Sequence, residues 1–286
     1  TLPNPYLRVF PIKEVADIGR KHNIPLIMDN TASPIICKPI EHGAAVVVHS
    51  LTKFIGGHGT TIGGCVVDGG NFDWTADKKR QPLFNEPDAS YGGAVWGEVV
   101  PQLTGANVTF AVRARVCLLR DLGAPLAPDN AWAIIQGLET APLRMKQHCS
   151  NAEKVVDFLK KHKNVERVIY PTLHVGEIAN RSKKYLKGGN GALVGIEVKG
   201  GVQAGKKFIE ALKMFYHVAN IGDARSLAIH PATTTHSQLT EEELLAAGVT
   251  PGYVRLSVGI EHPDDIIGDL DQALGASGKP SLKAVS

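Results

Sequence analysis

Two short, continuous apolar runs near the start of the chain restrict its fold more than any other feature. The first covers residues 24–28 and ends at Asp29, and the second covers residues 44–48 and is followed closely by Ser50. Residues 11–23, just before the first run, carry apolar side chains at helical spacing. Apolar runs of this kind, separated by helices, are typical of parallel strands buried on both faces. Ligands of such sheets collect where the strands end, so we expect Asp29 and Ser50 to lie at a site.

The second half of the chain predicts a further set of strands and helices. Strand-like segments are expected at residues 165–170, 192–198 and 253–258, and helices at residues 204–215, 241–247 and 264–274. Ser150 to Glu153 and Thr240 to Glu243 each have the pattern of a capping box that opens a helix. We therefore expect an α/β protein with a mostly parallel sheet, flanking helices and a smaller C-terminal α/β domain. Residues 1–144 would form the end of the large domain, and residues 145–286 the small one.

Composition excludes several classes of protein. The chain has 286 residues, of which 43% are apolar, which is enough for a sizeable core. Its apolar stretches are far shorter than the roughly 20 residues that cross a bilayer, so no membrane span is expected. The net charge of +3 is spread along the chain, which gives no reason to expect a nucleic-acid partner. Four widely spaced cysteines indicate reduced thiols, and we expect a small-molecule ligand and no metal site.

The strongest local signal is Ser50-Leu51-Thr52-Lys53, a lysine just beyond a buried strand with two hydroxyls before it. A lysine that forms a Schiff base must be partly desolvated, and hydroxyls nearby can hold a phosphate. Taken alone, such a lysine is more often simply solvated. Asp29, 24 positions earlier, strengthens the hypothesis because a carboxylate at a strand end can pair with a protonated pyridine nitrogen. Its alternative role is to cap the next turn.

Four blocks in order carry a family resemblance: Asn4-Pro5, residues 28–32, residues 50–53 and residues 253–261. Together they resemble the Cys/Met-metabolism family of enzymes that depend on pyridoxal 5′-phosphate (PLP) and have fold type I. The resemblance extends from about residue 1 to residue 274, which is nearly the whole chain.

The resemblance implies roles for five cofactor-side residues. Lys53 matches the lysine that forms a Schiff base with PLP, and Asp29 matches the carboxylate that holds the pyridine nitrogen. Ser50 and Thr52 match hydroxyls that bind the cofactor phosphate. Asn4 matches an asparagine near the phenolic oxygen of PLP and the substrate, although an asparagine before proline is otherwise a common turn residue.

On the substrate side, Arg255 matches the arginine that binds the α-carboxylate, for which its planar fork is suited. Ser226 matches a serine that faces the substrate. By contrast, His58 is as easily a loop-packing residue as a site residue, and we interpret His230 and His236 as structural, since their spacing is not that of a metal site.

The loop after Lys53 indicates the branch of the family. Residues 57–64 resemble the sulfhydrylases, and residues 230–239 point the same way. This implies γ-replacement, in which sulfide or methanethiol displaces acetate from O-acetylhomoserine to give homocysteine or methionine. The alternatives are a cystathionine γ-synthase, a cystathionine γ-lyase or a methionine γ-lyase. The sequence leaves open whether the donor is acetylated or succinylated.

The resemblance also implies a cytoplasmic homotetramer whose subunits share active sites. Thr1 is not an initiator residue and residues 1–5 have the character of a mid-chain loop, so we expect a preceding N-terminal segment of the same protein to be missing. The missing segment would carry a phosphate-binding loop and an aromatic residue stacked on the cofactor ring. A non-enzyme alternative is an inactive fragment that completes a partner's fold.

Overall fold

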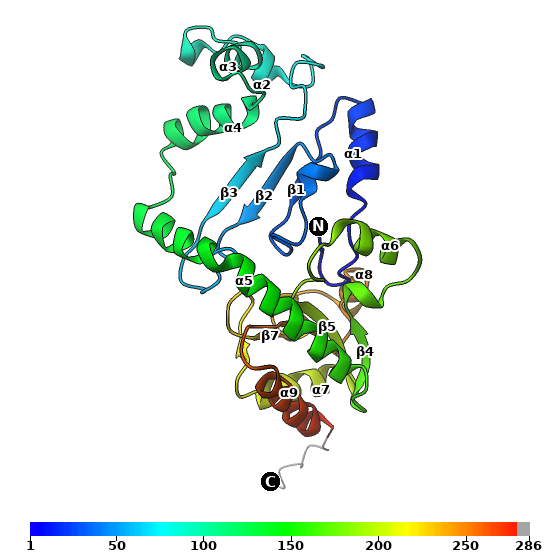
Figure 1. Cartoon of the computed structure of the whole chain (residues 1–286). Helices are drawn as coiled ribbons and strands as arrows, with labels where there is room; N and C mark the ends of the chain where they lie inside the picture. Colours follow the sequence, from blue (N-terminus) through cyan, green and yellow to red (C-terminus); the bar gives the residue numbers. More distant parts are fainter. Residues whose placement is uncertain (279–286) are drawn as a thin grey trace.

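A computed structural model describes residues 1–278, which form two β-sheets with helices around them (Figure 1). The strands are β1 (Ile27–Asp29), β2 (Val46–Ser50), β3 (Gly64–Asp68), β4 (Val165–Ile169), β5 (Leu193–Val198), β6 (Tyr216–His217), β7 (Leu227–Ile229) and β8 (Tyr253–Ser257). The helices are α1 (Ile12–Lys21), α2 (Pro82–Asn85), α3 (Trp96–Thr104), α4 (Thr109–Arg113), α5 (Pro128–Leu159), α6 (Gly176–Tyr185), α7 (Gly201–Ala211), α8 (Glu241–Ala246) and α9 (Pro263–Ser277). A π-helical segment, Ala114–Arg120, follows α4.

The first sheet has the strand order β1-β2-β3, and it carries both predicted strand ends. Strands β1 and β2 are parallel, with Asp29 opposite Val48, while β3 is antiparallel to β2 and places Gly64 opposite Ser50. Because paired residues share a face, Asp29, Val48 and Ser50 lie on the same face of the sheet. The carboxyl ends of β1 and β2 therefore meet at one edge, as the sequence predicts.

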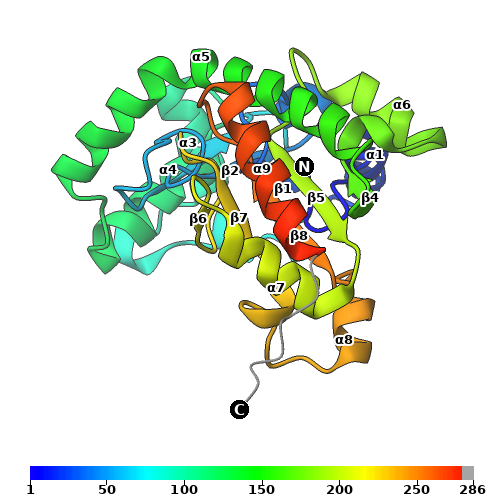
Figure 2. The same ribbon diagram turned by 90° about the horizontal axis from the view of Figure 1, so that it is seen from below.

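The second sheet has the order β4-β5-β8-β7-β6 and is antiparallel except for the β6–β7 pair. Helices α5, α7 and α9 cover one of its faces (Figure 2). Alternate residues of β8, Val254 and Leu256, are fully buried in the core beneath these helices. Side chains alternate along a strand, so Tyr253 and Arg255 are directed to the opposite face.

Most of the predicted elements are confirmed, with one clear exception. The Thr240 capping box opens α8 as expected, and its hydroxyl accepts a hydrogen bond from Glu243 N. The Ser150 capping box is wrong, because Ser150 lies inside the 32-residue helix α5. Within α5 the backbone of residues 150–153 already has helical partners, and Ala152 is fully buried. The domain division at residue 145 falls within this helix and stays a prediction.

Residues 72–105 contain α2 and α3, which pack around an aromatic cluster. Trp74 lies at the centre of this cluster, in ring contact with Phe72, Phe84 and Phe110. Within residues 1–278, no helix is both long enough and apolar enough to cross a membrane. All four cysteines are free thiols, as predicted.

Candidate active site

Lys53 lies in a tight turn that follows strand β2. Its amine is half-buried and donates a hydrogen bond to the Oδ1 atom of Asn220, 167 residues further along the chain. Desolvation lowers the pKa of Lys53, and the nearby positive charge of Arg255 lowers it further. A larger neutral fraction of the amine makes it a better nucleophile and base near neutral pH.

Arg255, on strand β8 of the second sheet, contacts the same residue as Lys53. Its Nη2 atom donates to the backbone oxygen of Asn220 at 3.2 Å, and burial lowers the pKa of its guanidinium. No carboxylate within residues 1–278 lies at ion-pair distance from Arg255 or from Lys53. Two cationic groups thus face a common space without an acidic partner, which favours an anionic ligand there.

Asp29 is connected to the Lys53 turn through Thr31. The Asp29 Oδ1 atom accepts from Thr31 N at 2.8 Å, and the Thr31 hydroxyl accepts from Ser50 N at 2.8 Å. Asp29 itself is exposed at the end of β1. The neighbouring His49 has a pKa lowered by burial, an effect that the Asp29 charge partly offsets. Its buried Nδ1 atom has no hydrogen-bond partner in the part of the chain that the structure describes.

The two predicted phosphate hydroxyls differ in their surroundings. Ser50 Oγ forms no hydrogen bond within the described residues, so it is available to a ligand. The Thr52 hydroxyl accepts from Gly63 N at 3.0 Å and donates to Gly63 O at 3.3 Å. It thus also closes the glycine-rich loop against the turn.

Asn4 lies at an exposed turn with a cis Asn4–Pro5 peptide bond. This turn is held to the second sheet, because Tyr253 donates from its hydroxyl to Pro5 O at 3.4 Å. Tyr253 precedes Arg255 by two residues on β8, so the Asn4 turn lies along the sheet face that carries Arg255.

The Ser226 hydroxyl forms two hydrogen bonds within the protein. The side chain is fully buried; its hydroxyl donates to Glu261 Oε2 at 2.9 Å and accepts from Gly259 N at 2.9 Å. The predicted substrate contact stays a prediction, and in this arrangement the hydroxyl is already engaged. His230 is likewise buried between Thr233 and Pro251, in keeping with a structural histidine.

Asn220 is the site residue that the sequence analysis missed. It precedes Gly222 in the same short segment as Ser226, and only the folded chain brings it to Lys53. The signal was present but indistinct: an asparagine in a loop between two strands is usually a turn residue.

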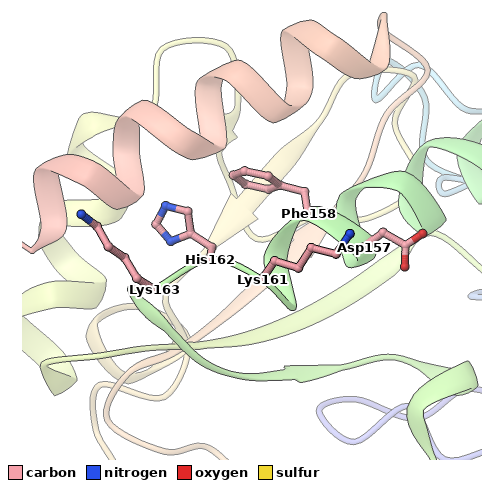
Figure 3. A pocket seen from close by; sticks show the side chains of 5 residues that line it. All are labelled: Asp157, Phe158, Lys161, His162 and Lys163. Atoms are coloured by element: carbon pink, nitrogen blue, oxygen red, sulfur yellow. The ribbon is translucent and has the colours of Figure 1, made fainter.

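A separate hollow lies near the C-terminal end of α5, lined by Asp157, Phe158, Lys161, His162 and Lys163. In Figure 3, Phe158 and His162 project toward α9, and His162 Nε2 lies 3.4 Å from Asp271 Oδ1. The five residues that line this hollow include no nucleophile paired with a base. Among the residues that the structure describes, no group of three or more His, Cys, Asp or Glu side chains could hold a metal ion.

Comparison with known proteins identifies the family of this chain. The sequence profile of the family described as Cys/Met metabolism PLP-dependent enzyme matches residues 1–275. The chain belongs to this family, and its cofactor is therefore PLP. The expected α/β fold of fold type I is confirmed.

Two relatives and two solved structures define the similarity more closely. The chain is 52% identical to an O-acetyl-L-homoserine sulfhydrylase of Leptospira meyeri and 45% identical to a homocysteine synthase of Schizosaccharomyces pombe; each match covers 96% of this chain and 63% of the relative. A solved structure from Campylobacter jejuni, assigned as an O-acetylhomoserine (thiol)-lyase with a pyridoxyl-lysine monophosphate, matches with a TM-score of 0.87 and 40% identity. The match covers 96% of this chain and 64% of that one. A cystathionine gamma synthase of Xanthomonas oryzae pv. oryzae has a TM-score of 0.75 at 30% identity, over 97% and 62% of the two chains. The chain thus spans less than two thirds of the length of these proteins.

Proposed function

We propose that the protein to which this chain belongs catalyses PLP-dependent γ-replacement on O-acetylhomoserine, with sulfide or methanethiol as the incoming nucleophile. Homocysteine or methionine and acetate are the products. The observation that carries the proposal is that the Lys53 amine and the Arg255 guanidinium both donate to Asn220. Neither cationic group has a carboxylate partner among the described residues. The match to sulfhydrylases over 96% of the chain supports the choice of reaction.

The residues at this place fit PLP. The phosphate is dianionic near neutral pH, and the free Ser50 hydroxyl suits it, together with Thr52. The exposed Asp29 carboxylate has one oxygen held by Thr31 and would keep a proton on the pyridine nitrogen. PLP, when bound, supplies an aldehyde for Schiff-base chemistry and a ring that withdraws electrons from the substrate.

The chain's own residues would then bind the substrate and move its protons. Arg255 would hold the α-carboxylate of the amino acid through its fork, with Asn4 on the same sheet face close to cofactor and substrate. The Lys53 amine would take the α-proton, since its lowered pKa leaves a larger fraction of it neutral. Asn220, as acceptor, would hold the resulting ammonium in place.

Replacing Lys53 with Ala in the whole protein tests this assignment. We expect loss of the visible absorbance of bound PLP and of homocysteine formation, because no other amine in this turn can take the place of Lys53. Lys183→Ala, which replaces an exposed lysine on α6, is the control. Persistence of both signals in Lys53→Ala would refute the role of Lys53.

The acceptor distinguishes the proposed reaction from its rivals. Steady-state assays would compare sulfide, methanethiol and cysteine, each with O-acetylhomoserine and with O-succinylhomoserine. A preference for cysteine would favour a cystathionine γ-synthase, and release of an α-keto acid without any thiol would favour a γ-lyase. Absence of PLP binding by the whole protein would favour the non-enzyme alternative.

We also propose that further polypeptide covers the first sheet. Strand β1 is an edge strand of the first sheet. On the sheet face that carries Asp29, Ile27 of β1 and Val66 of β3 are 49% and 47% exposed. Apolar side chains at a sheet edge are normally covered. A preceding N-terminal segment of the same protein would supply this cover, with its phosphate loop beside Ser50 and Thr52. Protection of β1 amides from hydrogen exchange in the whole protein would support this arrangement.

A homotetramer with shared active sites is proposed on the same grounds. Trp132 and Leu143 on the outer side of α5 are 66% and 72% exposed, as expected of a surface that contacts another copy. Sedimentation of the whole protein would measure the number of subunits. A cytoplasmic location also stays a prediction, and the four free thiols agree with a reducing compartment.

A further inference from the structure

Helix α5 buries a positive charge beside the Lys53 turn. Arg144 is 7% exposed, and no carboxylate within the described residues pairs with it. Instead the guanidinium donates to the backbone oxygens of Phe54 at 2.7 Å, Ile55 at 2.8 Å and Gly137 at 2.6 Å. A buried charge without an opposite charge is costly, so a position like this needs a specific compensation.

The compensation comes from the end of the turn that carries Lys53. Gly57 N donates to Lys53 O at 2.7 Å, and Gly56 N donates to Leu51 O at 2.8 Å, so residues 51–57 form a compact turn. Phe54 and Ile55, which directly follow Lys53, present carbonyl groups that this turn leaves without backbone partners. Carbonyls at such an end carry partial negative charge, which a cationic side chain stabilises.

The shape of the contact leaves the guanidinium little freedom. A Cβ atom on Gly57 would lie 2.0 Å from Arg144 Nη1, and Gly57 also has a φ of +74°. A Cβ atom on Gly137 would lie 2.2 Å from Gly56 O. Helix and turn therefore meet backbone to backbone, with Arg144 filling the space beside them.

The same face of α5 reaches the strand that carries Arg255. His148, one helical turn after Arg144, stands edge-on to the Phe54 ring at 5.3 Å between centroids. Its Nδ1 atom lies 2.7 Å from Val258 O, just beyond the end of β8. One helix face thus contacts both the Lys53 turn and the end of the Arg255 strand.

We propose that Arg144 is a positioning residue, whose guanidinium fixes the turn after β2 so that the Lys53 amine faces Asn220 and Arg255. The inference rests on the proposed function, since it concerns the orientation of the Lys53 amine toward PLP. The Arg144 guanidinium donates to the backbone oxygens of Phe54 and Ile55, so it would act on Lys53 through the backbone of the turn.

Three variants of the whole protein, Arg144→Met, Arg144→Lys and the exposed control Lys183→Met on α6, test the inference. The readouts are kcat and KM, the pH midpoint of the visible absorbance of bound PLP, and the fraction of PLP fixed to Lys53 by borohydride, measured by mass spectrometry. We expect Arg144→Met to lower kcat by about 10-fold to 100-fold with a small change in KM, because the misplaced amine reacts slowly. The pH midpoint should also shift.

Arg144→Lys should fail to restore wild-type values, since an ammonium cannot bond both carbonyls as the fork does. Wild-type kcat and pH midpoint in Arg144→Met would overturn the inference. If that variant does not fold, wild-type values in Arg144→Lys would overturn it equally. If the wild-type protein fixes no PLP at Lys53, the proposed function itself fails, a result that is distinct from a normal Arg144 variant.

Discussion

Replacing Gly137 with Ala sets two opposite effects against each other in helix α5. Alanine is the better helix former by about 1 kcal/mol, so the change would stabilise an exposed helix. At this position the new Cβ would lie 2.2 Å from Gly56 O and 2.8 Å from Gly56 Cα. Backbone atoms cannot rotate away, and the helix and the turn must separate by about 1 Å to reach ordinary contact. Such overpacking typically costs about 1–3 kcal/mol.

Separation would also stretch the bonds from Arg144 to the turn, and bonds from a charged donor contribute about 1.5–3 kcal/mol each. The overlap and the stretched bonds together exceed the propensity gain, so we expect Gly137→Ala to lower the free energy of unfolding by about 2 kcal/mol or more. The kcat should fall with it, because Lys53 moves with the turn.

The matched control is Gly268→Ala in α9, where a Cβ atom would meet nothing within 4 Å. That variant should be stabilised by about 0.5–1 kcal/mol. Urea unfolding followed by circular dichroism would measure both changes in the whole protein. A Gly137→Ala protein as stable as Gly268→Ala, with normal turnover, would refute the argument that the turn is fixed by close contact with α5.

Three further predictions concern the site and the second sheet. Arg255→Leu should raise the KM for the amino-acid substrate by about 10-fold to 100-fold, as expected when a charged hydrogen bond is lost; steady-state kinetics would measure this change. The same variant should raise the pKa of Lys53, because it removes a neighbouring positive charge. The pH dependence of amine labelling in the PLP-free protein would measure that pKa. Burial lowers the pKa of His148 from 6.5 to about 4, so the folded protein favours the neutral imidazole. The resulting contribution to stability, up to about 3 kcal/mol, is present above pH 6.5 and is lost as the pH falls toward 4. His148→Gln should therefore make the free energy of unfolding, measured with urea, depend less on pH in this range. Asp269→Ala should destabilise the protein by about 3 kcal/mol, because the carboxylate accepts from the backbone nitrogens of residues 213–215; an unchanged unfolding midpoint would contradict this role.

Much of the fold could be predicted from the sequence because the informative patterns are local. Strands β1 and β2 follow the two apolar runs, and Asp29 and Ser50 lie at the ends of these strands. The Ser50 to Lys53 motif likewise marks a turn that the structure contains. In these cases, the periodicity of a few neighbouring residues decides the result.

What could not be predicted depends on contacts between distant segments. Ser150 has the local pattern of a helix start, but buried residues before and after it, such as Cys149 and Ala152, continue one helix through that point. Tertiary packing here overrides the capping signal. Asn220 similarly becomes a site residue only when the chain folds it onto Lys53, and Arg144 when α5 packs against the turn.

The continuity of α5 matters to anyone who wishes to dissect this protein. At about 1.5 Å per residue, its 32 residues extend for roughly 48 Å and lie against both sheets. A cut at residue 145 would leave Arg144 on one fragment and His148 on the other, and would expose the inner side of both half-helices. Truncated or fused forms of this chain should therefore keep residues 128–159 intact, with any cleavage or fusion site placed in an exposed loop such as the one at Gly123.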